Sequence, residues 1–245
     1  MSMESPLHHF ELHPIIPMSV MGLDISINKA VIAMWIGSAV IFGVFMLVVK
    51  GGVSLIPGKV QSLAEMILEF IGGMVEEFIG EADRAKFLPF IASLFLFILA
   101  CNLIGLIPGS YTITSQLVVT GAFAVGIFIM TLVIGFGRHG MHFLSVLVPP
   151  GVPKVMIPLM IPIEIISMLA RPISLAVRLF ANMTAGHTVL AVLFGLAMSS
   201  PLWVGWLPFG FTVIINGLEI AIAIIQAYIF TTLTCVYIGD VIKLH

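Results

Sequence analysis

The polar residues of this sequence that could do chemistry are concentrated in one long apolar segment, 156–198. Successive members are separated by 3, 4, 3, 4 and 4 positions, a spacing that places them along one face of a helix. They are Glu164, Ser167, Arg171, Ser174, Arg178 and Asn182. The next apolar segment has its own set on one face, Asn216, Glu219 and Gln226, with Asp240 near its end.

Arg178 most needs an explanation, because arginine keeps its charge in a protein. A charge at bilayer depth costs at least about 2.5–3.5 kcal/mol and usually faces protein or a water-filled cavity. Glu219 and His187 can exchange protons, whereas a fixed cation repels them. These residues indicate a proton route that Arg178 divides into two halves. Crossing it requires a mobile carboxylate, and we expect a partner chain to supply one because none in this chain has such a position.

A structural explanation of the two arginines stays open at this point. Arg171 and Arg178 could instead pair with Glu164 and Glu219 and hold two helices together. The proton route is the preferred explanation for Arg178, whereas for Arg171 the sequence favours neither. His187 lies nine residues beyond Arg178, about half a turn away around the helix, so it points to another side.

The composition indicates a polytopic, all-α membrane protein. The chain is 60% hydrophobic and 9% charged, with a mean hydropathy of +1.20, whereas soluble domains carry about 25% charged residues. The net charge of −2 argues against nucleic-acid binding. Cys101 and Cys235 lie in apolar segments and are expected to be buried hydrophobic residues, not a disulfide or a metal site.

About five membrane crossings are predicted, near 30–49, 87–107, 114–136, 156–198 and 208–242. Residues 1–28 are expected to form an arm outside the membrane and 29–245 a single transmembrane domain, in which 156–242 is the helix pair of the proton path. Residues 57–82 show helical spacing of apolar residues with glutamates on the other side. They predict an amphipathic helix on the inner membrane surface.

The basic residues predict an orientation with the N-terminus outside and the C-terminus inside. The inner segments then hold most of them: Lys50, Lys59, Arg84, Lys86, Arg138, Lys154 and Lys243. The segment 156–198 would extend roughly 60 Å as one helix, about twice the hydrocarbon thickness. Because its polar stripe runs through Pro172, we predict one continuous helix, and we expect the last two helices to be long and strongly tilted.

The run RPISLAVRLFANMTAGH, 171–187, resembles the signature of the a subunit of F-type ATP synthases, the stator half of the proton channel. PLHHFELHP near the start, NLIGLIPG at 102–109, and Glu219 with Gln226 are similar to the same family. The resemblance therefore covers most of the chain, and its run at 171–187 is highly specific. It implies as partners a rotating ring of c subunits with mid-membrane carboxylates, the b subunits of the peripheral stalk, and the lipid bilayer.

The resemblance also implies roles for individual residues. Arg178 matches the essential arginine that releases the proton from the ring carboxylate and separates the half-channels. The positions that match the half-channel open to the outside are Asn182, His187, Glu219 and Gln226. Glu164 and Ser174 match polar positions toward the inner half-channel. Asn102 matches a polar position in the third helix, where a helix–helix hydrogen bond explains it equally well.

One departure concerns His187 and Glu219. Some bacterial members of the family have Glu and His at these positions in the opposite order, which implies that the two side chains meet across the helix pair and that either order relays protons. The sequence favours protons over sodium. It has no GxxxxGK[ST] loop for phosphate, so nucleotide chemistry is expected in other subunits, and the chain is not an enzyme by itself.

No cofactor is expected, and the resemblance implies a bacterial inner (plasma) membrane, with the mitochondrial inner membrane as the alternative. Two other functions stay open from the residues alone. A self-contained secondary transporter would often show internal repeats with broken helices, and we find no repeat between the halves. A purely structural anchor would explain the acidic surface helix but not the mid-membrane Arg178.

Overall fold

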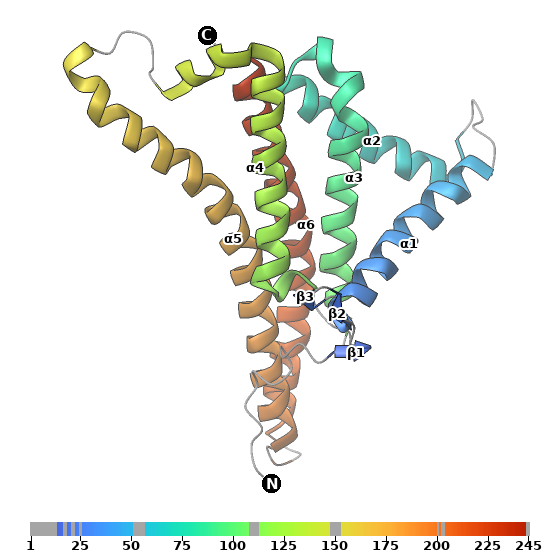
Figure 1. Ribbon diagram of the computed structural model, residues 1–245. Helices are drawn as coiled ribbons and strands as arrows, with labels where there is room; N and C mark the ends of the chain where they lie inside the picture. Colours follow the sequence, from blue (N-terminus) through green and yellow to red (C-terminus); the bar gives the residue numbers. More distant parts are fainter. Residues whose placement is uncertain are drawn as a thin grey trace.

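The computed structural model describes residues 14–16, 19–20, 23–24, 26–50, 57–107, 113–147, 153–199, 201 and 204–243. Six α-helices form the body of the chain (Figure 1): α1 (Lys29–Lys50), α2 (Lys59–Phe78), α3 (Glu81–Gly105), α4 (Leu117–His139), α5 (Ile157–Ser199) and α6 (Trp206–Ile242). Among the described residues, three 3-10 helices lie between them: η2 (Ile113–Ser115), η3 (Gly140–Leu147) and η4 (Lys154–Met156). The prediction of an all-α membrane architecture is confirmed.

Short strands precede α1, and the sequence pattern does not predict them. β1 (Pro14–Ile16) pairs antiparallel with β4 (Ile27–Asn28), and β2 (Ser19–Val20) pairs antiparallel with β3 (Leu23–Asp24). The Asn28 side chain then accepts a hydrogen bond from the backbone N–H of Val31, at 3.1 Å, in the first turn of α1.

Four helical segments are long and apolar enough to cross a membrane: Glu81–Gly105, Leu117–Val146, Ile157–Ser199 and Trp206–Ile242. A shorter apolar segment, Lys29–Gly43, lies in α1. α3 begins at Glu81, before the predicted 87, because Gly80 turns the chain with φ of 119° and acidic side chains in the first turn suit a helix N-terminus.

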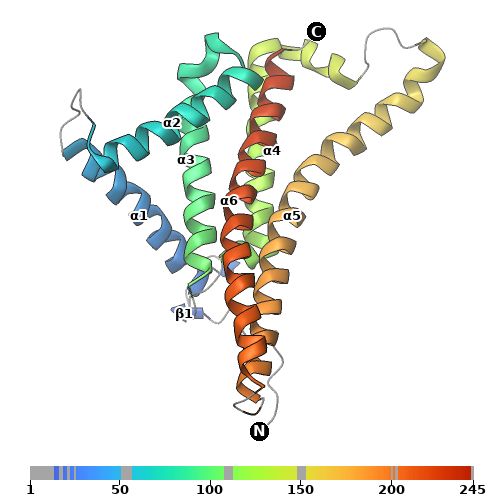
Figure 2. The same cartoon turned by 180° about the vertical axis from the view of Figure 1, so that it is seen from behind.

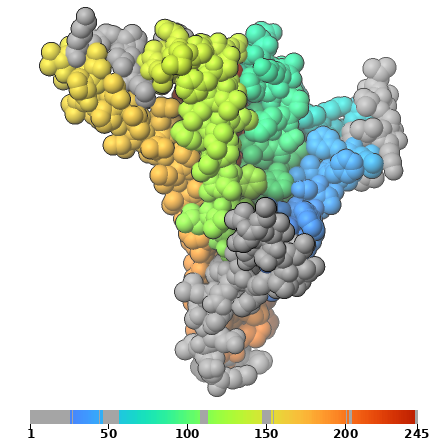
Figure 3. Space-filling view, viewed as in Figure 1, coloured from blue at the N-terminus to red at the C-terminus, as the bar shows by residue number. Residues whose placement is uncertain are grey.

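The helices form a fan in which α6 lies between α3 and α5 (Figure 2), and α6 packs against α2, α3, α4 and α5. α1 and the N-terminal part of α5 slant away on opposite sides (Figure 3). α5 is one helix of 43 residues through Pro162 and Pro172, as predicted, and its direction changes along its length in Figure 1. At 1.5 Å per residue, α5 is about 65 Å long and α6 about 55 Å.

A helix, α2, is present within the range predicted for the surface helix, and a narrower part of it is buried than expected. Ile71, Met74 and Val75 are buried, whereas Leu63 and Met66, from the predicted apolar side, are more than half exposed. The core around α2 is closed by fully buried side chains of α3, α5 and α6, among them Ile91, Leu179, Phe230 and Ile238.

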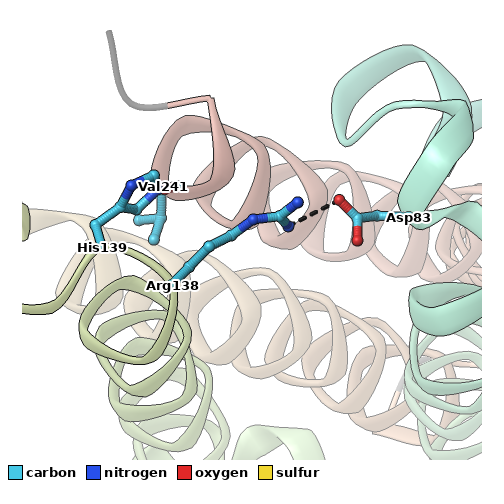
Figure 4. A network of polar contacts seen from close by, with 4 residues as sticks. All are labelled: Asp83, Arg138, His139 and Val241. Carbon is cyan, nitrogen blue, oxygen red and sulfur yellow. Dashed lines mark hydrogen bonds and ion pairs between the residues drawn. The ribbon is translucent and has the colours of Figure 1, made fainter.

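Polar contacts join the ends of α3, α4 and α6 at one end of the fan (Figure 4). The Arg138 guanidinium at the end of α4 lies 2.8 Å from a carboxylate oxygen of Asp83 in the first turn of α3. His139 Nε2 lies 3.0 Å from the carbonyl oxygen of Val241 and, as the donor, satisfies a carbonyl in the last turn of α6. The segments that carry Arg84, Lys86 and Arg138 thus lie at one end of the bundle.

We expect Gly239→Ala to lower the midpoint of thermal unfolding in detergent by about 3–10 °C, since overpacking costs about 1–3 kcal/mol. A Cβ atom at Gly239 would overlap the backbone carbonyl of Phe78, so α2 and α6 would have to separate. The matched control is Gly217→Ala on the same helix, where an added Cβ meets no atom within 4 Å. Equal midpoints for the two variants would show that this close approach does not limit stability.

Candidate functional site

The polar stripes of α5 and α6 face each other along an antiparallel contact. Asn182 Nδ2 donates to Gln226 Oε1 at 2.8 Å. One turn further along α5, Gly186 packs against Glu219, and a Cβ at this glycine would overlap the carboxylate. A side chain at position 186 would require the Glu219 carboxylate or the helices to shift, so Gly186 is what lets this carboxylate lie against α5.

Arg171 forms a pair that differs from the one considered in the sequence. Its Nη1 lies 3.3 Å from Asp240 Oδ2, and its guanidinium lies 5.4 Å from the centre of the Tyr237 ring. The alternative that Arg171 pairs with Glu164 or Glu219 is therefore wrong. Because the two helices are antiparallel, the N-terminal half of α5 lies against the C-terminal end of α6, which holds Asp240 and not Glu219. Glu164 lies seven residues before Arg171 on the same helix, which is too far for a side-chain contact.

Arg178 is exposed and belongs to no hydrogen bond or ion pair within the described part of the chain. Leu175, one turn before Arg178, and Leu179, the next residue, are buried, so Arg178 lies at the edge of the buried side of α5. The alternative that Arg178 pairs with Glu164 or Glu219 is thus also wrong. An exposed charge at membrane depth needs a partner, and the described part of the chain does not provide one.

Glu219 is 5% exposed, and neither carboxylate oxygen has a hydrogen-bond partner among the described residues. Gln226 is 1% exposed and keeps one unpaired group, Nε2, beside its bond to Asn182. Unpaired polar groups of this kind are costly, at about 1–3 kcal/mol each. Such groups usually form hydrogen bonds with ordered water, or change their protonation state so that less charge is buried.

Asn102 of α3 reaches the same part of α6. It is fully buried, and its Nδ2 donates to the carbonyl oxygen of Ala223 at 3.3 Å, while its Oδ1 has no partner in the described structure. The helix–helix hydrogen bond expected for Asn102 is therefore present. Because Ala223 lies between Glu219 and Gln226, the bond places Asn102 beside both.

The remaining predicted residues are His187, Glu164 and Ser174. His187 is half-buried on α5 directly after Gly186, Glu164 is half-buried, and Ser174 is exposed. No hydrogen bond or ion pair joins Glu164 or Ser174 to another residue of the described ranges. The structure thus brings together Asn182, Gln226, Glu219 and Asn102, but not Arg178, Glu164 or Ser174.

A mostly apolar cavity adjoins the Arg171 pair, between α4, η3, α5 and α6. Its lining includes Thr131, Phe143, Met168, Tyr237 and Asp240. Among the described residues, no three or more His, Cys, Asp or Glu side chains are grouped to hold a metal ion. Cys101 and Cys235 are buried free cysteines.

Four features of this region could not be predicted from the sequence. They are the ion pair of Asp240 with Arg171, the close contact of Gly186 with Glu219, and the buried hydroxyls of Thr114 and Thr184. The only signal was their type: a glycine within the polar run of α5, and hydroxyls in apolar segments. Periodicity does not distinguish these from ordinary helix residues.

Comparison with known proteins gives concordant results. The family model of the ATP synthase A chain matches residues 31–239. The chain is 49% identical to ATP synthase subunit a of Magnetococcus marinus, covering 98% of this chain and 93% of that protein. It is 44% identical to the Pelagibacter ubique subunit, covering 98% of both, and 42% identical to that of Rhodospirillum rubrum, covering 99% and 100%. Together with the membrane helices, these matches show that the chain belongs to the ATP synthase A chain family and is a multi-pass membrane component of the ATP synthase complex.

Proposed function

We propose that this chain is the proton-translocating stator subunit of an F-type ATP synthase, with two offset half-channels that meet at Arg178. The observation that carries the proposal is the contrast between Arg178 and its surroundings. Arg178 is exposed on α5 without a hydrogen bond or ion pair to any described residue, while a buried polar cluster lies further along the same helix pair. A fixed charge in that position can form an ion pair with a carboxylate from another chain.

The partner on this face is the ring of c subunits, whose mid-membrane carboxylates would meet Arg178 in turn. Exposed apolar side chains elsewhere around α5 support contact with another membrane chain: Ile166, Ile173 and Val177 are 67%, 62% and 47% exposed. Arg178 attracts each ring carboxylate, favours release of its proton, and prevents protons from passing directly between the half-channels. The b subunits of the peripheral stalk are proposed as further partners.

The outer half-channel would run through Asn182, His187, Glu219 and Gln226, with Asn102 beside them. Glu219 and His187 can accept and donate protons, and the amides can orient water between them. The inner half-channel would pass Glu164 and Ser174 on the other side of Arg178. The two routes then reach α5 at different levels, so a proton can complete its passage only on a rotating carrier.

The proposed orientation has the N-terminus outside and the C-terminus inside a bacterial plasma membrane. Its support is that the segments with Arg84, Lys86 and Arg138 gather at the end of the bundle where α6 also ends. The subunit itself would not catalyse ATP formation. One charge crossing 100 mV releases about 2.3 kcal/mol, so several protons must drive each nucleotide, which suits a rotor with many equivalent carboxylates.

We expect Arg178→Ala to reduce ATP-driven proton pumping in inverted vesicles to the level of vesicles without the complex. Without the fixed charge, the ring carboxylate has nothing to favour release of its proton. Assembly is the control: the variant chain must be recovered with the c-ring and the catalytic head. Normal pumping by an assembled complex that carries Arg178→Ala would contradict the mechanism. Proton transport by the chain without a c-ring would favour a self-contained transporter.

Arg171, the other arginine of the stripe, is expected to behave as a structural partner of Asp240. Arg171→Asp and Asp240→Arg should each lower thermal stability in detergent, and the double exchange should restore most of it. The coupling energy should be about 0.5–1 kcal/mol, since both side chains are partly exposed. Losses in the single variants that simply add in the double variant would contradict the pairing.

A further inference from the structure

Six buried side-chain atoms have no hydrogen-bond partner within the described ranges. Their residues lie on η2, which packs against α3 and α5, and on α3, α5 and α6, where α6 packs against both other helices. The residues are Asn102, Thr114, Thr184, Glu219 and Gln226. Native proteins leave few buried polar groups unpaired, and inside a bilayer the cost of doing so is higher. Ordered water commonly supplies the missing partners, each molecule making about three hydrogen bonds to such groups.

Contacts between α3, α5 and α6 tie these residues together. Asn102 bonds the carbonyl of Ala223, in the middle of the α6 segment 219–226. The α5 segment 182–186 meets the same part of α6 at both of its ends, through a hydrogen bond and through the close glycine contact. Thr184 lies at the centre of that segment, and its buried hydroxyl has no partner.

Thr114 lies on a separate element that packs against two of the same helices. It lies in η2, whose three residues are all buried and which packs against α3, α4 and α5. The hydroxyl of Thr114 has no partner, although the residue is 3% exposed. Other buried threonines of this chain differ, because Thr131, Thr231 and Thr234 donate to carbonyls of their own helices at 2.8–2.9 Å.

We propose that the hydroxyls of Thr114 and Thr184 hold a chain of water molecules that leads protons to Glu219, so that η2 is part of the outer half-channel. This proposal rests on the proposed function. A threonine hydroxyl donates one hydrogen bond and accepts others, so it can orient water without being ionised. The free Asn102 Oδ1 and Gln226 Nε2 complete the set, one accepting from and one donating to the same waters.

The first test replaces the hydroxyls. Thr114→Val and Thr184→Val keep the branched shape but cannot hold water, and we expect ATP-driven proton pumping in inverted vesicles to fall several-fold with the complex assembled. Thr114→Ser and Thr184→Ser keep the hydroxyl and should pump at nearly the unmodified rate. The matched control is Thr234→Val, because Thr234 is fully buried and has its hydroxyl bonded within α6.

A second test detects water directly and remains informative if a valine variant fails to assemble. In a Cys101→Ala, Cys235→Ala background, Thr114→Cys and Thr184→Cys should make pumping sensitive to Ag⁺, which reacts with the thiolate that forms in contact with water. Thr234→Cys in the same background should stay insensitive.

The outcomes separate this inference from the function on which it depends. Unchanged pumping in both valine variants, or cysteines at 114 and 184 that are no more sensitive to Ag⁺ than the one at 234, would overturn the water chain. A loss that serine does not restore would also overturn it, because it would mark a packing defect. In these cases the Arg178→Ala result still decides the proposed function, which fails only if that variant pumps normally.

Discussion

The antiparallel contact between α5 and α6 is the interaction on which the polar chemistry of this chain depends. Inside a bilayer, polar side chains must face protein or water, since lipid offers no hydrogen bonds. The Arg171–Asp240 pair, the Asn182–Gln226 bond and the Gly186–Glu219 contact all lie along this one interface. A shift of α6 along α5 by one turn, about 5.4 Å, would break all three at once. The register of two helices therefore decides which polar groups are paired and which stay available.

The two arginines of the stripe illustrate that selection. Both lie on the same side of α5, seven residues apart, yet only Arg171 has an acidic partner in the described structure. The difference arises from α6, whose Asp240 lies opposite Arg171, whereas no acidic side chain of the described ranges forms an ion pair with Arg178. A paired arginine stabilises the contact between the two helices, and an exposed, unpaired one can meet a partner chain. The neighbouring helix thus determines the different surroundings of two residues of the same type.

Much of this arrangement could be predicted from the sequence. The apolar runs and the 3- and 4-residue spacing predict the helices, the single α5 through Pro172 and the two polar stripes, because these are local properties of one helix. The partner of Arg171, the contact of Gly186 with Glu219, and the unpaired hydroxyls of Thr114 and Thr184 could not be predicted. They depend on the register and rotation of helices that are far apart in the sequence, and periodicity determines neither. The strand pairs before α1 are too short to leave an alternating pattern.

The distance between Arg178 and Glu219 has a physical consequence for a proton route. Glu219 contacts α5 at Gly186, eight residues beyond Arg178, which is about 12 Å along the helix axis. At an effective dielectric constant of about 20, two unit charges attract by about 1.4 kcal/mol at that distance, against about 4 kcal/mol at 4 Å. In direct contact, the guanidinium would hold Glu219 ionised and would itself be neutralised, so neither group could act on a proton carrier. Separation along one helix leaves the carboxylate free to gain and lose a proton and leaves the arginine charge for a partner.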